Sequence, residues 1–127
     1  MSDVPGFLRF AESHEWARLE ADGLVTVGLS DYAQETLGDV VFVEPPEVGR
    51  VCGAGDAVGV VESVKAASDT YTPVAGEVIA VNDELAASPE LINSEPYDAW
   101  IYQLRPSDRS QLDRLLDADG YKALIGE

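Results

Sequence analysis

The sequence is poor in the residues that most disulfides, metal sites and catalytic centres require. Its 127 residues include one cysteine, Cys52, and one histidine, His14. A lone cysteine excludes an internal disulfide and is best explained as a small buried hydrophobe. A lone histidine excludes a metal site built from several histidines. No Gly-x-Ser-x-Gly element is present, which argues against a nucleophile elbow; a triad of Ser13, His14 and an aspartate stays open.

Long apolar segments are missing as well. No window reaches the roughly 18 apolar residues that a membrane-spanning helix requires. The first residues, 1–6, carry neither a basic region nor an apolar run, as a secretory signal would. We therefore expect a cytoplasmic bacterial protein without membrane contact. It should form a single domain, 1–127, long enough to bury about two-thirds of its unfolded surface.

Positive charge is scarce. Eight lysines and arginines stand against 24 aspartates and glutamates, which gives a formal net charge of −16. Nucleic acid is excluded as a partner because its phosphates would be repelled. An acidic surface suits docking against basic partner surfaces, and a solvated coat without a specific role is the alternative.

Runs of β-prone residues account for most of the chain. Strands are predicted over 7–10, 14–19, 24–29, 38–43, 57–64, 70–74, 76–81 and 99–104. A short helix should follow a cap at Ser30 or Asp31 and stop at Gly38. Another helical turn is expected over 88–93 with Pro89 in its first turn. The tail should be helical from a cap at Ser107, with an interruption over 117–120.

Two of these runs resemble each other. Gly-Asp-Val-Val-Phe-Val at 38–43 and Gly-Glu-Val-Ile-Ala-Val at 76–81 agree in five of six positions by residue class. The repeat predicts two similar half-sheets about a pseudo-two-fold axis. Chance similarity between two valine-rich strands is the alternative.

A polar stretch, 62–73, separates two of the β-prone runs and predicts a tight hairpin. Lys65 then lies at or next to its tip. The only other lysine of the chain is Lys122. A tip holds the primary amine in solvent and presents it to other proteins, which suits a lysine that is modified. On spacing alone, an ordinary solvated turn lysine is the simpler interpretation.

The residues around Lys65 resemble a known attachment site. Glu-Ser-Val-Lys-Ala at 62–66, with Pro-Val-Ala-Gly at 73–76, is similar to the lipoyl hairpin of swinging-arm carrier domains. The longer form Glu-Ser-Val-Lys-Ala-Ala-Ser-Asp resembles the H-protein family of the glycine cleavage system. Biotinyl domains are a distant alternative, because Val64 and Ala66 replace the methionines of their Met-Lys-Met.

The resemblance to this family continues over nearly the whole chain. It rests on Ser-His-Glu-Trp at 13–16, Ala-Gln at 33–34, Leu-Gly-Asp at 37–39, Val-Phe-Val at 41–43, Gly-Glu-Val at 76–78, Val-Asn at 81–82, Pro-Glu-Leu at 89–91, Asn-Ser at 93–94 and Pro-Tyr at 96–97. The chain departs from the family at Tyr32, where a histidine is common, and Thr36 occupies a variable position. A relay of lipoate to other proteins, in place of glycine cleavage, stays open.

The resemblance implies a mainly β, lipoyl-domain-like barrel-sandwich hybrid of two half-sheets with short flanking helices and a helical C-terminus. It implies lipoate in amide linkage on Lys65, and a monomeric, non-catalytic carrier of the aminomethyl group of glycine. The implied partners are the pyridoxal-phosphate-dependent glycine decarboxylase (P protein), the aminomethyltransferase (T protein), the dihydrolipoyl dehydrogenase (L protein) and lipoylating enzymes.

Two further sets of residues are expected to act with Lys65, the first because a hairpin holds side chains at fixed positions beside the lysine and the second from the same resemblance. Glu62, Ser63 and Val64 are expected to be recognised by the lipoylating enzyme, although ordinary strand residues would show the same pattern. Ser13, Glu15 and Asp69 are expected to line a cleft that holds the loaded arm. In that cleft, Glu15 and Asp69 would face the cationic amine; membership of the general acidic coat is the alternative.

An enzymatic role for Lys65 has less support. Schiff-base chemistry needs an amine with a lowered pKa, from burial or a neighbouring cation. Glu62 and Asp69 are near in sequence and would stabilise the charged amine. A purely structural or adaptor module is the remaining alternative.

Overall fold

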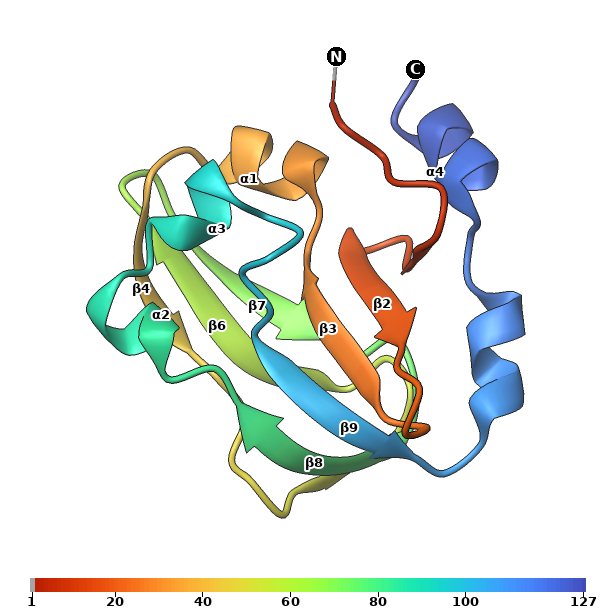
Figure 1. Ribbon diagram of the computed structural model, residues 1–127. Coiled ribbons are helices and arrows are strands. Elements are labelled where there is room, and N and C mark those ends of the chain that lie inside the picture. The colour runs from red at the N-terminus through yellow and green to blue at the C-terminus, as the bar shows by residue number, and fades with distance from the viewer. Residues whose placement is uncertain (1) are drawn as a thin grey trace.

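The computed structural model describes residues 2–127 and is mainly β (Figure 1). No helix among these residues has the length and apolar character needed to cross a membrane. In chain order the elements are β1 (Arg9–Phe10), β2 (Glu15–Leu19), β3 (Val25–Leu29), α1 (Asp31–Leu37), β4 (Val40–Glu44), β5 (Val51–Cys52), β6 (Ala57–Ser63), β7 (Ala67–Tyr71), β8 (Gly76–Val81), α2 (Glu84–Ala87), α3 (Leu91–Ser94), β9 (Tyr102–Pro106), the 3₁₀ helix η1 (Arg109–Arg114) and α4 (Ala118–Leu124).

Two antiparallel sheets form the body of the molecule. One has six strands in the order β1-β2-β3-β9-β8-β5, and the other has three in the order β4-β6-β7. The two similar runs of the sequence fall in different sheets, β4 in the smaller and β8 in the larger. The predicted architecture of two half-sheets is confirmed, and the sheets do not close into a continuous barrel.

The core lies between the sheets, and a second apolar cluster lies at the chain ends. Trp16 and Tyr121 are fully buried in this second cluster, which ties β2 to α4. The two ends of the described chain lie close together, because the Ser2 N–H donates to the Glu127 carboxylate at 3.0 Å. Cys52 is buried in the main core, as predicted.

Several strand and helix boundaries differ from the prediction. β7 begins at residue 67 instead of 70, because β6 supplies a complete ladder of partners even for polar residues at an edge. β9 covers 102–106, not 99–104, since Ala99 N–H is bonded to Glu95 in the preceding turn. α2 was not predicted, and α3 begins two residues after Pro89.

For α1 the structure selects one of the two predicted cap residues, and in the C-terminal region it corrects the prediction. Ser30, and not Asp31, caps α1, with its hydroxyl accepting from Ala33 N–H at 3.1 Å. Asp108, and not Ser107, caps η1. The expected interruption over 117–120 is instead the start of α4, because the Asp117 carboxylate accepts from Gly120 N–H at 2.8 Å.

Candidate functional site

The hairpin of β6 and β7 presents Lys65 at its tip. Ser63 N–H donates to Ala66 C=O at 2.8 Å, which leaves Val64 and Lys65 as the two loop residues. The Ser63 hydroxyl accepts from Lys65 N–H at 3.2 Å and from Ala66 N–H at 3.3 Å. Both loop residues are exposed. Ser63 therefore has a structural role, since its side chain satisfies the backbone donors of the turn that carries the lysine.

The Lys65 side chain lies across the C-terminal end of α1. Its Nζ donates to Thr36 C=O at 3.2 Å. A Cβ at Gly38 would approach Lys65 Cε to 2.9 Å, and Gly38 has a φ of +77°. Glycine is favoured there by the backbone conformation, and a larger residue would also displace the end of the Lys65 side chain.

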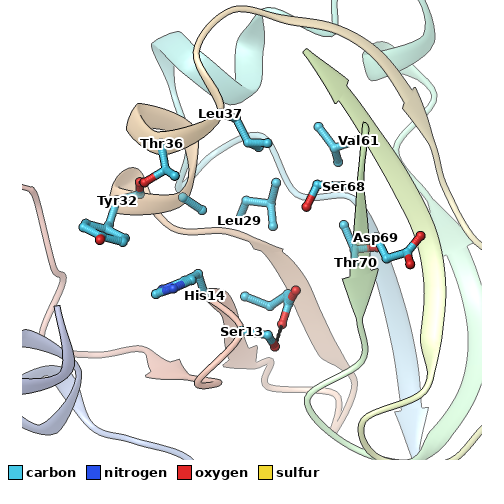
Figure 2. A pocket seen from close by; sticks show the side chains of 12 residues that line it. Ser13, His14, Leu29, Tyr32, Thr36, Leu37, Val61, Ser68, Asp69 and Thr70 are labelled. Carbon is cyan, nitrogen blue, oxygen red and sulfur yellow. Dashed lines mark hydrogen bonds between the residues drawn. The ribbon is translucent and has the colours of Figure 1, made fainter. Parts of the chain in front are cut away.

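A cleft of about 210 Å³ lies between α1 and β7, with the segment before β2 at one end (Figure 2). Leu29, Ala33, Leu37 and Val61 give the cleft apolar surface, and the end formed by the segment before β2 is polar. The lining residues are Ser13, His14, Glu15, Leu29, Tyr32, Ala33, Thr36, Leu37, Val61, Ser68, Asp69 and Thr70. Thr36, whose carbonyl accepts the hydrogen bond from the Lys65 amine, is one of these lining residues. The lysine therefore reaches the mouth of the cleft.

Glu15 is the buried acid of the cleft, with 2% of its surface exposed. Its carboxylate accepts from the Ser13 hydroxyl and, at 3.2 Å, from the N–H of Tyr71. These contacts join the six-stranded sheet to the free edge of β7. Burial raises the pKa of Glu15 to about 7, against the opposing effect of the hydrogen bonds that its carboxylate accepts. The side chain therefore changes charge near neutral pH.

Asp69 contributes backbone to the cleft. Along an antiparallel hairpin, hydrogen-bonded and non-hydrogen-bonded pairs of residues alternate. Ser63–Ala66 is a hydrogen-bonded pair, so Val61–Ser68 is the next such pair and Val60–Asp69, between them, is not one. The N–H and C=O groups of Asp69 and Tyr71 therefore point to the free edge of β7. The Asp69 carboxylate lies on the opposite face of β7 from Ser68 and points away from the cleft (Figure 2). This placement replaces the expected carboxylate contact with a backbone carbonyl.

His14 lines the cleft and is hydrogen-bonded to a residue of the C-terminal helix α4. Its Nδ1 lies 2.8 Å from the hydroxyl of the fully buried Tyr121, which lies 2.6 Å from the hydroxyl of Ser30. His14 has a φ of +79°, and burial lowers the pKa of its imidazole. Its ring also packs on Tyr32 with centroids 5.0 Å apart. Tyr121 thus connects two walls of the cleft, the segment before β2 and the start of α1.

The structure brings Ser13, Glu15 and Asp69 together at one cleft, and it places Glu62, Ser63 and Val64 on the hairpin with Lys65. Sequence reasoning missed the roles of Gly38 and Tyr121. Gly38 was recognised only as a helix stop, and Tyr121 only as an apolar position of a short stripe. Neither pattern contains a signal for contacts across 27 or 107 positions of the chain.

Comparison with known proteins gives a consistent result. A family model described as "Glycine cleavage H-protein" matches residues 8–127. "Glycine cleavage system H protein 2" of Pseudomonas putida is 75% identical over 127 residues and is covered completely, as is this chain. The protein of the same name from Pseudomonas aeruginosa is 62% identical, with 98% of this chain and 97% of the relative covered. A crystal structure of a glycine cleavage system H protein from Mycobacterium marinum superimposes with a TM-score of 0.88 at 36% identity, covering 98% of this chain and 100% of that one.

Proposed function

Because this chain belongs to the glycine cleavage H-protein family, a family of lipoyl carriers, we propose that its lipoyl group is attached to Lys65. The supporting observation is the position of Lys65, exposed on a two-residue hairpin tip with its Nζ at the mouth of the cleft. Lys122, the other lysine, lies in the last turn of α4 and has no comparable setting.

The residues of the cleft fit such a group. Leu29, Leu37 and Val61 offer apolar surface to an aliphatic chain, while Ser13 and Glu15 provide hydrogen-bond acceptors at the far end. The bound lipoyl group supplies the dithiolane sulfur that takes up the aminomethyl group of glycine. In our proposal the chain presents this arm in turn to the decarboxylase, the aminomethyltransferase and the dihydrolipoyl dehydrogenase in the bacterial cytoplasm. It supplies no catalytic base or nucleophile itself.

The cleft residues would hold the protonated amine of the cargo and exclude water from it. Glu15, ionised beside a cation, accepts a charge-assisted hydrogen bond. The Asp69 carbonyl on the edge of β7 is a second acceptor, and the Ser13 hydroxyl is a neutral third. On the hairpin, Glu62 and Val64 offer side chains to the lipoylating enzyme, whereas Ser63 holds the turn.

The first experiment follows the modification and loading of Lys65 by mass. After treatment with a lipoylating enzyme, peptide mass spectrometry should find one lipoyl adduct, on Lys65 and not on Lys122. Lys65→Arg should carry none, since a guanidinium is not acylated in this way. Carbon-13 glycine and the decarboxylase should then add a labelled aminomethyl mass to the lipoylated protein only.

Other outcomes would redirect the proposal. A biotin adduct on Lys65 would identify a biotinyl carrier. A lipoyl adduct that glycine and the decarboxylase never load would point to a lipoate relay. An unmodified Lys65 under conditions that modify a known lipoyl domain would refute the carrier role.

A further inference from the structure

A second groove, of about 550 Å³, lies between η1 and the strands β1 and β2. Phe7 and Arg9 line it from the β1 segment, Leu19 from the end of β2, and Arg109 and Asp113 from η1. Phe7 and Leu19 expose 74% and 50% of their surfaces. We name this the η1 groove. The function proposed above uses none of its residues.

The groove has a fixed base and a closed strand edge. Ala17, which is paired with Arg9, and Leu112 of η1 also line the groove and are buried members of the main core. The N–H and C=O of Phe10 are bonded to Leu116, at 2.8 and 2.9 Å, so this edge of β1 cannot pair with an added strand. A ligand of the groove must therefore be recognised by side chains.

The two arginines of the groove lack a charged partner. Among residues 2–127 there are two ion pairs, and neither includes Arg9 or Arg109. The carboxylate of Asp108, next to Arg109, instead accepts from the N–H and the hydroxyl of Ser110, at 3.0 and 2.6 Å. Asp113 lines the groove but pairs with neither arginine. The groove thus has an excess of positive charge in a chain with a formal net charge of −16.

This combination indicates the chemistry of the ligand. Guanidinium groups bind carboxylates through charge-assisted hydrogen bonds, and Phe7 and Leu19 add apolar surface beside them. Their exposure leaves the groove open, whereas pockets for small molecules cover most of the ligand. Duplex nucleic acid or an anionic membrane would extend past the groove and be repelled by the acidic remainder of the surface. A short segment with acidic and apolar side chains avoids both difficulties.

We propose that the η1 groove is a docking site for a short acidic, apolar segment of a partner protein. Glu15 begins β2 and Leu19 ends it, so about 13 Å of strand separates the groove from the cleft. In Figure 1 the turn between β6 and β7 is at the upper left, and the residues of η1, in blue, are at the right. A partner docked here holds the protein while Lys65 and the cleft stay accessible.

The binding test uses two fluorescein-labelled synthetic peptides of equal length. One repeats Glu-Leu-Asp-Phe, and the other repeats Glu-Ser-Asp-Ser, which has the same charge without apolar side chains. Fluorescence anisotropy should show saturable binding of the first peptide only. Its affinity should fall as salt is added, because salt screens the attraction between exposed charges.

Charge-reversal variants locate the binding site. Arg9→Glu/Arg109→Glu should weaken binding of the apolar acidic peptide about tenfold, as for loss of two exposed charge pairs. Arg50→Glu/Lys122→Glu is the matched control, because it changes the net charge equally at two exposed residues outside the groove. This control should bind within about twofold of the parent. Both variants should keep the parent's Tm.

A second variant tests the apolar part of the site. Phe7→Ser/Leu19→Thr should also weaken binding about tenfold, while the salt dependence remains. Equal loss of affinity in the two charge-reversal variants would reveal a general charge effect and overturn the proposal. Absence of peptide binding to the parent, or equal binding of the serine peptide, would overturn it as well.

Two further measurements separate this site from other surfaces. The lipoylated and the unmodified protein should bind the peptide equally, and a difference would show that the groove and the arm are not independent. Sedimentation of the parent should show a monomer. A dimer that Arg9→Glu/Arg109→Glu abolishes would assign the groove to a second copy and overturn the proposal. None of these readouts requires lipoylation of the parent, so their failure would leave the carrier role intact.

Discussion

At the scale of single residues, Glu15 is a costly feature of the fold. Its carboxyl group is 2% exposed, and burial raises its pKa to about 7. An unfolded glutamate titrates near 4.3. The folded protein therefore binds this proton more tightly than the unfolded chain does. Between about pH 4.5 and pH 7, the contribution of Glu15 to the free energy of unfolding should therefore fall as pH rises. Above pH 7 this contribution should be constant.

Glu15→Gln should remove this dependence. The amide keeps the shape of the side chain without an ionisable proton. The gain in unfolding free energy of the variant over the parent should be larger at pH 8 than at pH 5, by up to about 3 kcal/mol. Denaturant unfolding of both proteins at the two pH values measures this difference directly. An equal difference at both values would show that Glu15 titrates normally.

Residue-level roles divide into those that local sequence can predict and those that it cannot. The position of Lys65 at a hairpin tip followed from β-branched runs around a polar break. The turn-holding bonds of Ser63 follow from the same local chemistry. The direction of the Asp69 carboxylate depends on the pairing register, which a polar strand without alternation does not specify.

Among the elements, α4 contacts two walls of the cleft through one residue. Tyr121 joins His14 and the α1 cap Ser30 through its hydroxyl. Tyr121→Phe should lower the unfolding free energy by about 1–3 kcal/mol. It should also change the balance between the two tautomers of the His14 ring, because Nδ1 loses its partner. The nitrogen-15 NMR shifts of the imidazole report this change, and the chain has only one histidine to observe.

Tyr97→Phe is the matched control for this variant. The Tyr97 hydroxyl also makes two hydrogen bonds near α1, accepting from Asp31 N–H and donating to Asp3 C=O. This variant should lose similar stability without changing the His14 shifts. Equal nitrogen-15 shifts in the parent and in Tyr121→Phe would show that Tyr121 does not position the histidine.

Elements were predictable where alternation or turn chemistry is strong. Most strands of both half-sheets and helix α1 follow from such patterns, whereas the two-residue strand β5 does not. The C-terminal region was less predictable because Asp-x-x-Gly suits both a loop and a helix cap, and only the Asp117 bond to Gly120 decides between them. The bulge in β4 between Val40 and Phe42 has no sequence signal either, since Val-Val-Phe-Val is typical of a fully buried strand.

In the whole molecule, the cleft is formed by segments from both sheets. The six-stranded sheet supplies Glu15, the three-stranded sheet supplies Lys65 and the edge of β7, and α1 lies between them. The sequence named three residues of this cleft through family resemblance. The cleft itself could not be derived from sequence pattern, because it forms only when distant segments pack together. The net charge of −16 adds a general preference for basic partner surfaces.

In the proposed function, Glu15 holds the loaded arm in the cleft. The direct measurement is the rate of formaldehyde release after the lipoylated protein is loaded with glycine and the decarboxylase is removed. Glu15→Ala should accelerate release about tenfold or more, since a hydrogen bond to a charged group contributes about 1.5–3 kcal/mol. Asp69→Ala, which keeps the backbone carbonyl, and Glu47→Ala, an exposed acid outside the cleft, should release at the parent's rate. Equal acceleration by Glu47→Ala, or none by Glu15→Ala, would show that Glu15 does not hold the arm in the cleft.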